Sequence, residues 1–301
     1  MKKIIIIIII ITLQLPLLLY AKQDVVPSST SSVQIYKMPN KMSFAGEEVP
    51  VHLPYVREAI EREVLTTTCM HTTTMLTLRA MSRYFPVIEP ILAEYGVPED
   101  FKYLAMAESG LNPNATSHAR AAGLWQFLSS AAGDYGLETG ENTDLRFHIE
   151  QSTRAACRYL LAAYELFGSW TLAAASYNAG RSGVLRRLTI QGVDNYWDLY
   201  LPEEAMRYVP RMVALKLVSS DPAAYNFELR EEDKLQPFKN YKIIEVNSPD
   251  IDWSKLAAEH GTNYRQLRIL NPWIRSYEYK NIGGTTYEVM IPTEGFKELG
   301  Y

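Results

Sequence analysis

The 301-residue sequence predicts a mainly α-helical protein with a small α+β module at its C-terminal end. Between residues 56 and 220, apolar and small residues recur at spacings of three and four, as on the buried face of a helix. Glycine or proline follows most of these periodic segments. Residues 238–294 instead place two short helical segments between two strand-like ones.

The N-terminal segment is typical of a secretory signal peptide. Lys2 and Lys3 precede an isoleucine run from Ile4 to Ile11, and apolar residues continue almost to position 21. We therefore predict a signal peptide over 1–21 and an exported protein, and an uncleaved membrane anchor stays open as the alternative. No cysteine lies near the predicted cleavage site, so the sequence does not support a lipoprotein anchor.

Residues 22–55 are rich in Ser, Pro and Val without helical periodicity, and we expect an extended lead-in. Residues 56–94 predict a helical extension that packs on the domain following it. We expect Phe85-Pro86 to break this extension, so that Val87–Tyr95 forms a separate short helix ending at Gly96.

The most informative stretch begins with an acid on an apolar stripe. If residues 100–109 are helical, one face carries Phe101, Leu104, Ala105 and Glu108. Burying an unpaired charge costs several kcal/mol, so Glu108 needs a cation or stays protonated with a raised pKa. Gly110 ends the helix, and this leaves Glu108 in its last turn, where a general acid is useful. The alternative is a frayed helix end whose acid reaches solvent.

Two later segments carry polar residues beside small ones. Ala121–Phe127, AAGLWQF, presents the amide of Gln126 next to a Leu-Trp pair that we expect to form the wall of a sugar site. The helix predicted over Trp170–Ala179 follows a long amphipathic one over Glu150–Phe167 and ends with Tyr177 and Asn178. Farther on, Glu204 and Tyr208 lie at helical spacing in EEAMRYVPRM.

These motifs, in this order, resemble the SLT domain of lytic murein transglycosylases, nearest to the transglycosylase D type. The resemblance covers about 95–213 and implies a lysozyme-like catalytic domain over 95–220 that cuts the glycan strands of peptidoglycan. It implies that Glu108 is catalytic and that substrate-binding residues surround it: Ser109, Gln126, Tyr177, Asn178 and Tyr208. Tyr177 is the expected hydrogen-bond partner of Glu108. Ala205 replaces the usual threonine, and Leu145 replaces an acid common in relatives.

The C-terminal region follows a charged linker over 221–237. We expect strands over Tyr241–Val246 and Tyr287–Ile291, with helices over Trp253–His260 and Tyr264–Leu270. This order resembles a LysM module over 238–294. The usual opening Gly-Asp-Thr-Leu is replaced by residues 248–251, Ser-Pro-Asp-Ile, so the resemblance implies the fold more than sugar binding.

The chemistry that fits best uses one acid. Glycosidases that work with two carboxylates hold them roughly 5 Å or 6.5–9.5 Å apart. The acids Asp134, Glu138, Glu141 and Asp144 lie in polar surroundings, and we expect all of them to be solvated. The resemblance implies that Glu108 protonates the oxygen between MurNAc and GlcNAc, then accepts the proton of the MurNAc C6 hydroxyl as a 1,6-anhydro ring closes. A lysozyme-like or chitinase-like hydrolase and a catalytically silent wall-binding protein remain alternatives.

Composition limits the other classes. A formal charge of −4 argues against a nucleic-acid binder, and the five scattered histidines show no metal-ligand spacing. We therefore expect peptidoglycan as the partner, in the periplasm or cell envelope, with no metal and no cofactor. Cys69 and Cys157 could pair after export or remain free thiols.

Overall fold

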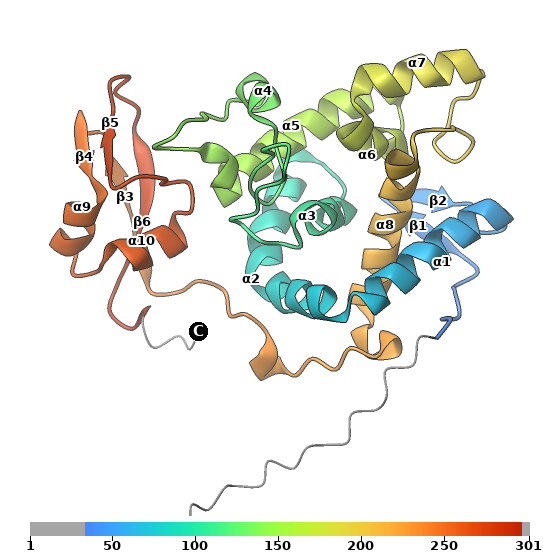
Figure 1. Ribbon diagram of the computed structural model, residues 1–301, viewed down its shortest axis with the longest axis horizontal. Coiled ribbons are helices and arrows are strands. Elements are labelled where there is room, and N and C mark those ends of the chain that lie inside the picture. Colours follow the sequence, from blue (N-terminus) through green and yellow to red (C-terminus); the bar gives the residue numbers. More distant parts are fainter. Residues whose placement is uncertain (1–33, 297–301) are drawn as a thin grey trace, which may run out of the picture. The chain divides into compact units, whose positions relative to one another are not determined.

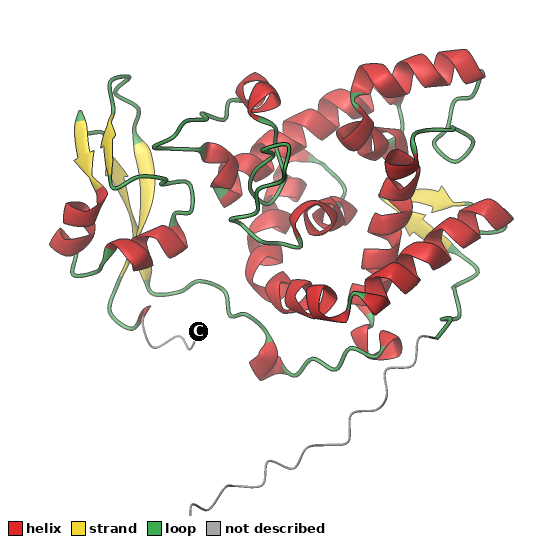
Figure 2. Cartoon of the chain, in the orientation of Figure 1, coloured by secondary structure: helices red, strands yellow, loops and turns green. Residues whose placement is uncertain are grey.

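A computed structural model describes residues 34–296 and confirms the mainly helical class (Figures 1 and 2). The predicted signal peptide lies outside the described residues. Within residues 34–296, none of the helices combines the length and apolar character that a membrane span requires.

The longer helices of the N-terminal and central regions are α1 (Pro54–Cys69), α2 (His71–Tyr95), α3 (Lys102–Ser109), α5 (Ile149–Phe167), α6 (Trp170–Ala179), α7 (Arg181–Gln191) and α8 (Glu203–Ser220). Shorter elements are α4 (Ser129–Ala132), η1 (Glu99–Phe101), η2 (Gly133–Tyr135), η3 (Leu145–Phe147), η4 (Pro222–Tyr225) and η5 (Glu231–Asp233). The remaining elements are β1 (Met42–Phe44), β2 (Glu47–Val49), β3 (Tyr241–Val246), β4 (Asp250–Asp252), α9 (Trp253–Glu259), α10 (Tyr264–Leu270), β5 (Glu278–Lys280) and β6 (Tyr287–Pro292).

The helix α3 lies near the middle of the helical domain, surrounded in Figure 1 by α2, α5, α6 and α8. Phe101, Leu104 and Ala105 are fully buried, as the stripe predicted. Ala174 and Ala175 of α6 are also fully buried, and their small side chains let α6 approach its neighbours closely. The central position of α3 brings its last turn within reach of residues from α6 and α8.

The predicted break at Phe85-Pro86 is wrong, because α2 continues through Pro86 and Pro90 to Tyr95. The interruption falls instead at Met70, between α1 and α2. A proline inside a helix costs about 3 kcal/mol. The buried apolar face of α2, which includes Phe85 and Ile88, compensates for that cost.

The expectation of an extended lead-in over 22–55 is also wrong for its described C-terminal part. Strands β1 and β2 form an antiparallel hairpin in which Met42 pairs with Val49. Ala45 and Gly46 both have positive φ, at 54° and 82°, which is typical of a two-residue hairpin turn. Phe44 is fully buried, so the hairpin is attached to the helical core.

The C-terminal module has the four predicted elements. Strand β3 pairs with β6 antiparallel, with Tyr241 opposite Pro292, and α9 and α10 lie between them in the chain. A second pair, β4 with β5, was not predicted, because each strand has only three residues.

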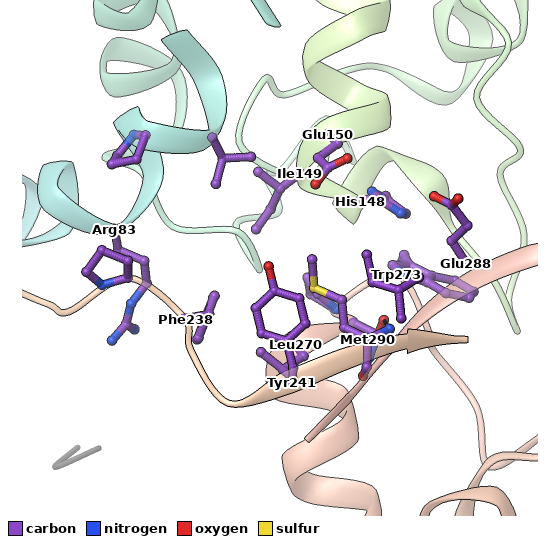
Figure 3. Close-up of a pocket in the computed structure, with 16 residues that line it drawn as sticks. Arg83, His148, Ile149, Glu150, Phe238, Tyr241, Leu270, Trp273, Glu288 and Met290 are labelled. Carbon is purple, nitrogen blue, oxygen red and sulfur yellow. Dashed lines mark hydrogen bonds between the residues drawn. The ribbon is translucent and has the colours of Figure 1, made fainter. Parts of the chain in front are cut away.

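This module contacts the loop that leads into α5. The backbone N–H of Asp144 donates to the Trp273 carbonyl over 2.9 Å, and that of Arg275 donates to the Asn142 carbonyl over 2.8 Å. Figure 3 shows a pocket at this junction, where His148 and Trp273 stack with ring centroids 5.9 Å apart. Burial lowers the pKa of His148 to about 4, so this ring is neutral at pH 7. The pocket contains none of the predicted site residues.

Candidate active site

The site is organised by the C-terminal end of α3. Gly110 takes the left-handed conformation, with φ of 58°, and its N–H donates to the Met106 carbonyl over 2.9 Å. The helix therefore stops directly after Ser109, as predicted. Glu108 lies in the last turn, with its apolar neighbours buried behind it.

The Glu108 side chain is partly buried and accepts a hydrogen bond from the Tyr208 hydroxyl of α8. Burial raises the pKa of Glu108 to about 7, while the Tyr208 hydrogen bond and the positive charge of Arg211 act in the opposite direction. The charge of Glu204 raises this pKa further. Near neutral pH the carboxyl is therefore present in both protonation states. A group that first donates and then accepts a proton must be able to adopt both states.

Tyr208 is 2% exposed and is held by α8 on the side facing α3. Burial and the negative charge of Glu108 raise the pKa of Tyr208 well above its usual range, so the hydroxyl keeps its proton and remains a donor. Its bond can stabilise the carboxylate form of Glu108 and fix the direction in which the acid points.

Tyr177 was expected to be the partner of Glu108, and this is wrong. Its hydroxyl donates to the Trp125 carbonyl over 2.8 Å. Its ring contacts Tyr159 edge-on, with centroids 4.9 Å apart, and also Phe127. Burial raises the pKa of Tyr177, and the negative charge of Glu108 raises it further. Tyr177 is therefore close enough to Glu108 to be affected by its charge, but its hydroxyl binds the loop of Trp125.

The Leu-Trp pair of the Ala121–Phe127 segment does not form an open wall. Leu124 and Trp125 are 1% and 0% exposed, and the Trp125 indole N–H donates to the Thr153 hydroxyl of α5 over 2.9 Å. The pair anchors the loop to α5. Gly123 permits a second anchor, because a Cβ there would lie 1.9 Å from the Arg146 carbonyl oxygen.

The three other predicted site residues differ in their hydrogen bonds and exposure. Gln126 has a positive φ of 48° and donates from its side-chain nitrogen to the carbonyls of Ala115 and Gly123. Ser109 donates to the Ala105 carbonyl one turn earlier in α3, over 3.0 Å. Asn178 is exposed at the C-terminal end of α6.

Two of the acids expected to be solvated have structural partners. Asp144 is 5% exposed and forms a bidentate ion pair with Arg146, which also donates to the carbonyls of Arg120 and Phe127. Arg146 therefore clamps the loop that carries Gln126. No local pattern predicted this clamp, because the two carbonyls that Arg146 binds lie 26 and 19 residues before it in the sequence.

Glu138 is the second such acid. Its carboxylate accepts hydrogen bonds from the hydroxyls of Thr143, Tyr279 and Tyr287, over 2.7, 3.2 and 2.8 Å. The two tyrosine bonds connect the helical domain to the C-terminal module. Asp134 and Glu141 are exposed, in agreement with the prediction.

The hairpin contributes a residue that the sequence did not reveal. The Glu47 carboxylate accepts bonds from the backbone N–H groups of Trp170 and Thr171 and from the hydroxyls of Ser169 and Thr171. It therefore caps the N-terminus of α6, where a negative charge is favourable. This contact fixes the helix whose other end carries Tyr177 and Asn178.

Cys69 and Cys157 are free thiols. Burial raises the pKa of Cys157 to about 12, which makes it an unreactive core residue. Among residues 34–296, no group of three His, Cys, Asp or Glu side chains is arranged to hold a metal ion.

Two parts of the chain match known protein families. Residues 86–199 match the family described as "Transglycosylase SLT domain", and residues 242–295 match "Soluble lytic transglycosylase C-terminal LysM-like domain". The chain is 28% identical over 265 residues to "Membrane-bound lytic murein transglycosylase D" of Escherichia coli (strain K12), covering 85% of this chain and 56% of that protein. It is 30% identical over 120 residues to "Putative tributyltin chloride resistance protein" of Alteromonas sp. (strain M-1), covering 38% of this chain and 58% of that one.

The chain thus spans little more than half the length of these curated relatives. The two family matches confirm the resemblance seen in the sequence and follow each other in the same order. The protein therefore combines a lysozyme-like transglycosylase SLT domain with the LysM-like C-terminal domain of the soluble lytic transglycosylases.

Proposed function

We propose that the protein is a peptidoglycan lytic transglycosylase, which cleaves the β-1,4 bond between MurNAc and GlcNAc and leaves 1,6-anhydro-MurNAc ends. The observation that carries the proposal is Glu108, a partly buried acid with a pKa near 7, beside a tyrosine hydroxyl that donates to it. The SLT match and the name of the Escherichia coli relative support the same activity.

In the proposed reaction one proton leaves Glu108 and one returns. Glu108 donates its proton to the glycosidic oxygen, and the C1–O4 bond breaks as positive charge develops on the MurNAc ring. The Glu108 carboxylate then accepts the proton of the C6 hydroxyl while O6 bonds to C1. No water is consumed, and Glu108 ends in the protonated state in which it began.

Different parts of the site take different roles in this proposal. Tyr208 orients Glu108 and stabilises its carboxylate form, and Tyr177 holds the loop of residues 111–127 through Trp125. In this proposal Gln126 and the exposed Asn178 bind acetamido or hydroxyl groups of the glycan. Ser109 shapes the end of α3 through its bond to Ala105.

A hydrolase would need a second free carboxylate. The charge of Glu204 acts on Glu108, but its carboxylate is paired with Arg211 over 2.8 Å. Asp144 and Glu138 are occupied by Arg146 and by three hydroxyls. These partners favour the single-acid reaction over a two-acid one.

Location is part of the proposal. The predicted signal peptide supports export to the periplasm or cell envelope, where peptidoglycan is the partner of both domains. The Escherichia coli relative is named membrane-bound. An uncleaved N-terminal segment would give this protein a comparable attachment.

The test is digestion of purified sacculi followed by mass spectrometry of the released muropeptides. The wild-type protein should release anhydro products, each lighter by one water than the product of a hydrolase. Glu108→Gln should abolish release while sacculus binding persists, and Glu141→Gln, which changes an exposed acid in the loop before η3, should keep full activity.

Hydrated reducing ends would identify a hydrolase instead. Binding by the wild-type protein without any released product would identify a silent wall-binding protein. Unchanged turnover by Glu108→Gln would exclude Glu108 as the acid.

A further inference from the structure

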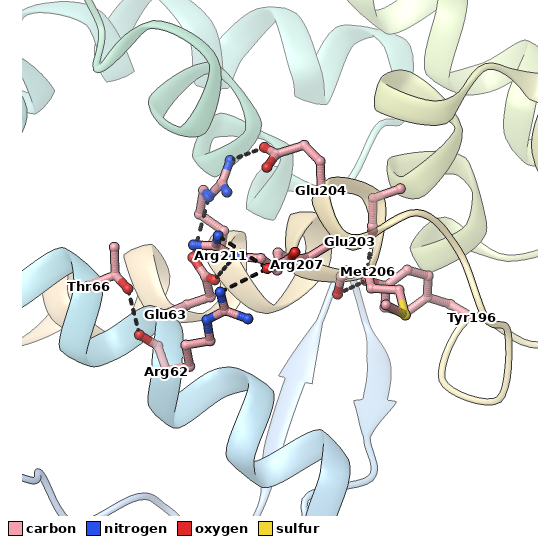
Figure 4. A network of polar contacts seen from close by, with 10 residues as sticks. Arg62, Glu63, Thr66, Tyr196, Glu203, Glu204, Met206, Arg207 and Arg211 are labelled. Carbon is pink, nitrogen blue, oxygen red and sulfur yellow. Dashed lines mark hydrogen bonds and ion pairs between the residues drawn. The ribbon is translucent and has the colours of Figure 1, made fainter.

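An ion-pair network around the buried Glu63 joins α1 to α8 (Figure 4). Glu63 of α1 is 1% exposed, and its carboxylate accepts bonds from Arg207 over 2.6 Å and from Arg211 over 3.4 Å. A carboxylate this deeply buried requires paired charges. The site described above includes the effects of Arg211 and Glu204 on Glu108 but gives no role to Glu63.

Arg211 is the member that connects the network to Glu108. It pairs with Glu63 on one side and with Glu204 on the other. Glu204, Tyr208 and Arg211 are spaced by four and three residues, so they share one face of α8. Tyr208 on that face donates to Glu108.

One pocket is lined both by members of this network and by residues from the end of α3. Its lining includes Glu63, Arg207 and Arg211, together with Ala107 and Gly110 of the α3 end. The latter two residues flank Glu108 closely in sequence. Arg211 therefore lines the same pocket as the turn that carries the acid.

We propose that Glu63 is a positioning residue, which holds Arg211 toward α1 and neutralises it so that this cation does not pair with Glu108. The inference rests on the proposed function. It gives α1, which precedes the SLT family match, a part in keeping Glu108 protonated.

The expected direction follows from the groups that face Glu108. From α8 these are Tyr208, Arg211 and Glu204, and from α6 the group is Tyr177, which is uncharged at neutral pH. The charge of Arg211 lowers the pKa of Glu108. Without the negative charge of Glu63, Arg211 keeps one carboxylate partner and acts more strongly on Glu108. The acid then loses its proton at lower pH.

The test compares three variants by the pH dependence of muropeptide release. Glu63→Gln keeps a side chain of the same shape, and the pH at which activity falls on the alkaline side should move down by about half a unit or more. Arg211→Met removes the cation and should move this pH up. Arg207→Met is the matched control, because Arg207 is also bonded to Glu63 but does not act on the Glu108 pKa, so the profile should keep its position.

A second readout does not depend on activity. The Glu108 carboxyl is titrated by carbon-13 NMR of glutamate-labelled protein and assigned with Glu108→Gln. The Glu108 pKa should fall in Glu63→Gln, rise in Arg211→Met and stay constant in Arg207→Met.

An unchanged Glu108 pKa in folded Glu63→Gln would overturn the inference, as would an equal shift in Arg207→Met. If circular dichroism shows that Glu63→Gln does not fold, Arg211→Met decides alone, and an unchanged pKa overturns the inference. If the wild-type protein releases no anhydro product, the proposed function fails while the titration still tests the role of Glu63.

Discussion

At the scale of single residues, the site depends on a contact between side chains 100 positions apart, Tyr208 and Glu108. The sequence placed Glu108 correctly in the last turn of a helix, because the apolar stripe and Gly110 are local signals. The choice between Tyr177 and Tyr208 as its partner was wrong, because that choice depends on how α6 and α8 pack around α3. Helical periodicity does not contain this information.

Tyr208→Phe tests the residue that holds the acid. In the wild-type protein the Tyr208 hydrogen bond lowers the pKa of Glu108. The substitution removes this bond, so the Glu108 pKa should rise and the alkaline fall of activity should move to higher pH. Turnover at the optimum should drop roughly 10- to 100-fold, because the carboxyl loses its orientation and its carboxylate form loses a donor. Sacculus digestion between pH 5 and about pH 9 measures both effects.

Tyr177→Phe is the matched control for the pH profile. It removes a hydroxyl that donates to Trp125 and should cost about 1 kcal/mol of stability while leaving the position of the alkaline fall unchanged. A profile that moves in Tyr177→Phe but stays in place in Tyr208→Phe would reverse the roles assigned to the two tyrosines.

At the scale of elements, the hairpin of β1 and β2 fixes α6 from outside the SLT match. Glu47 accepts four bonds at the N-terminus of α6, and the same helix carries Tyr177 and Asn178 at its other end. The hairpin therefore positions part of the site by holding the opposite end of a ten-residue helix.

Glu47→Ala should lower the free energy of unfolding by about 1–3 kcal/mol, because several donors at the start of α6 lose a charged acceptor. Urea denaturation followed by circular dichroism measures this change. Glu48→Ala alters the exposed neighbour and should stay within about 0.5 kcal/mol of the wild type. Equal stability of both alanine variants would show that the cap does not hold α6.

Element boundaries show which structural signals are local. Helices α6 and α10 and strand β3 match their predicted ranges. The signals for them are local, namely capping residues at the helix ends and alternating side-chain polarity in the strand. The break in α2 was misplaced, because proline predicts a local cost but not the burial that offsets it. The hairpin and the pair of β4 with β5 were missed, because strands of three residues are too short for alternation to appear.

At the scale of the whole molecule, one loop links the C-terminal module to the site. Asp144 donates from its backbone to Trp273 of the module, and its carboxylate holds Arg146. Arg146 in turn holds the carbonyls of Arg120 and Phe127 in the loop that carries Gln126. The module and the active-site loop are thus attached to the same short segment, which no property of either sequence region alone predicts.

Glu138→Ala tests whether this attachment makes the two domains unfold together. The substitution removes the acceptor of the Tyr279 and Tyr287 hydroxyls, and Tyr287 is only 3% exposed, so these donors would be left without their partner on the helical domain. We expect a loss of about 1–3 kcal/mol from the contact and two separate transitions in differential scanning calorimetry, with the module unfolding first. Glu141→Ala changes an exposed acid three residues away and should keep the wild-type trace. A wild-type protein that already unfolds in two transitions, unaffected by Glu138→Ala, would mean that the contact does not couple the domains in solution.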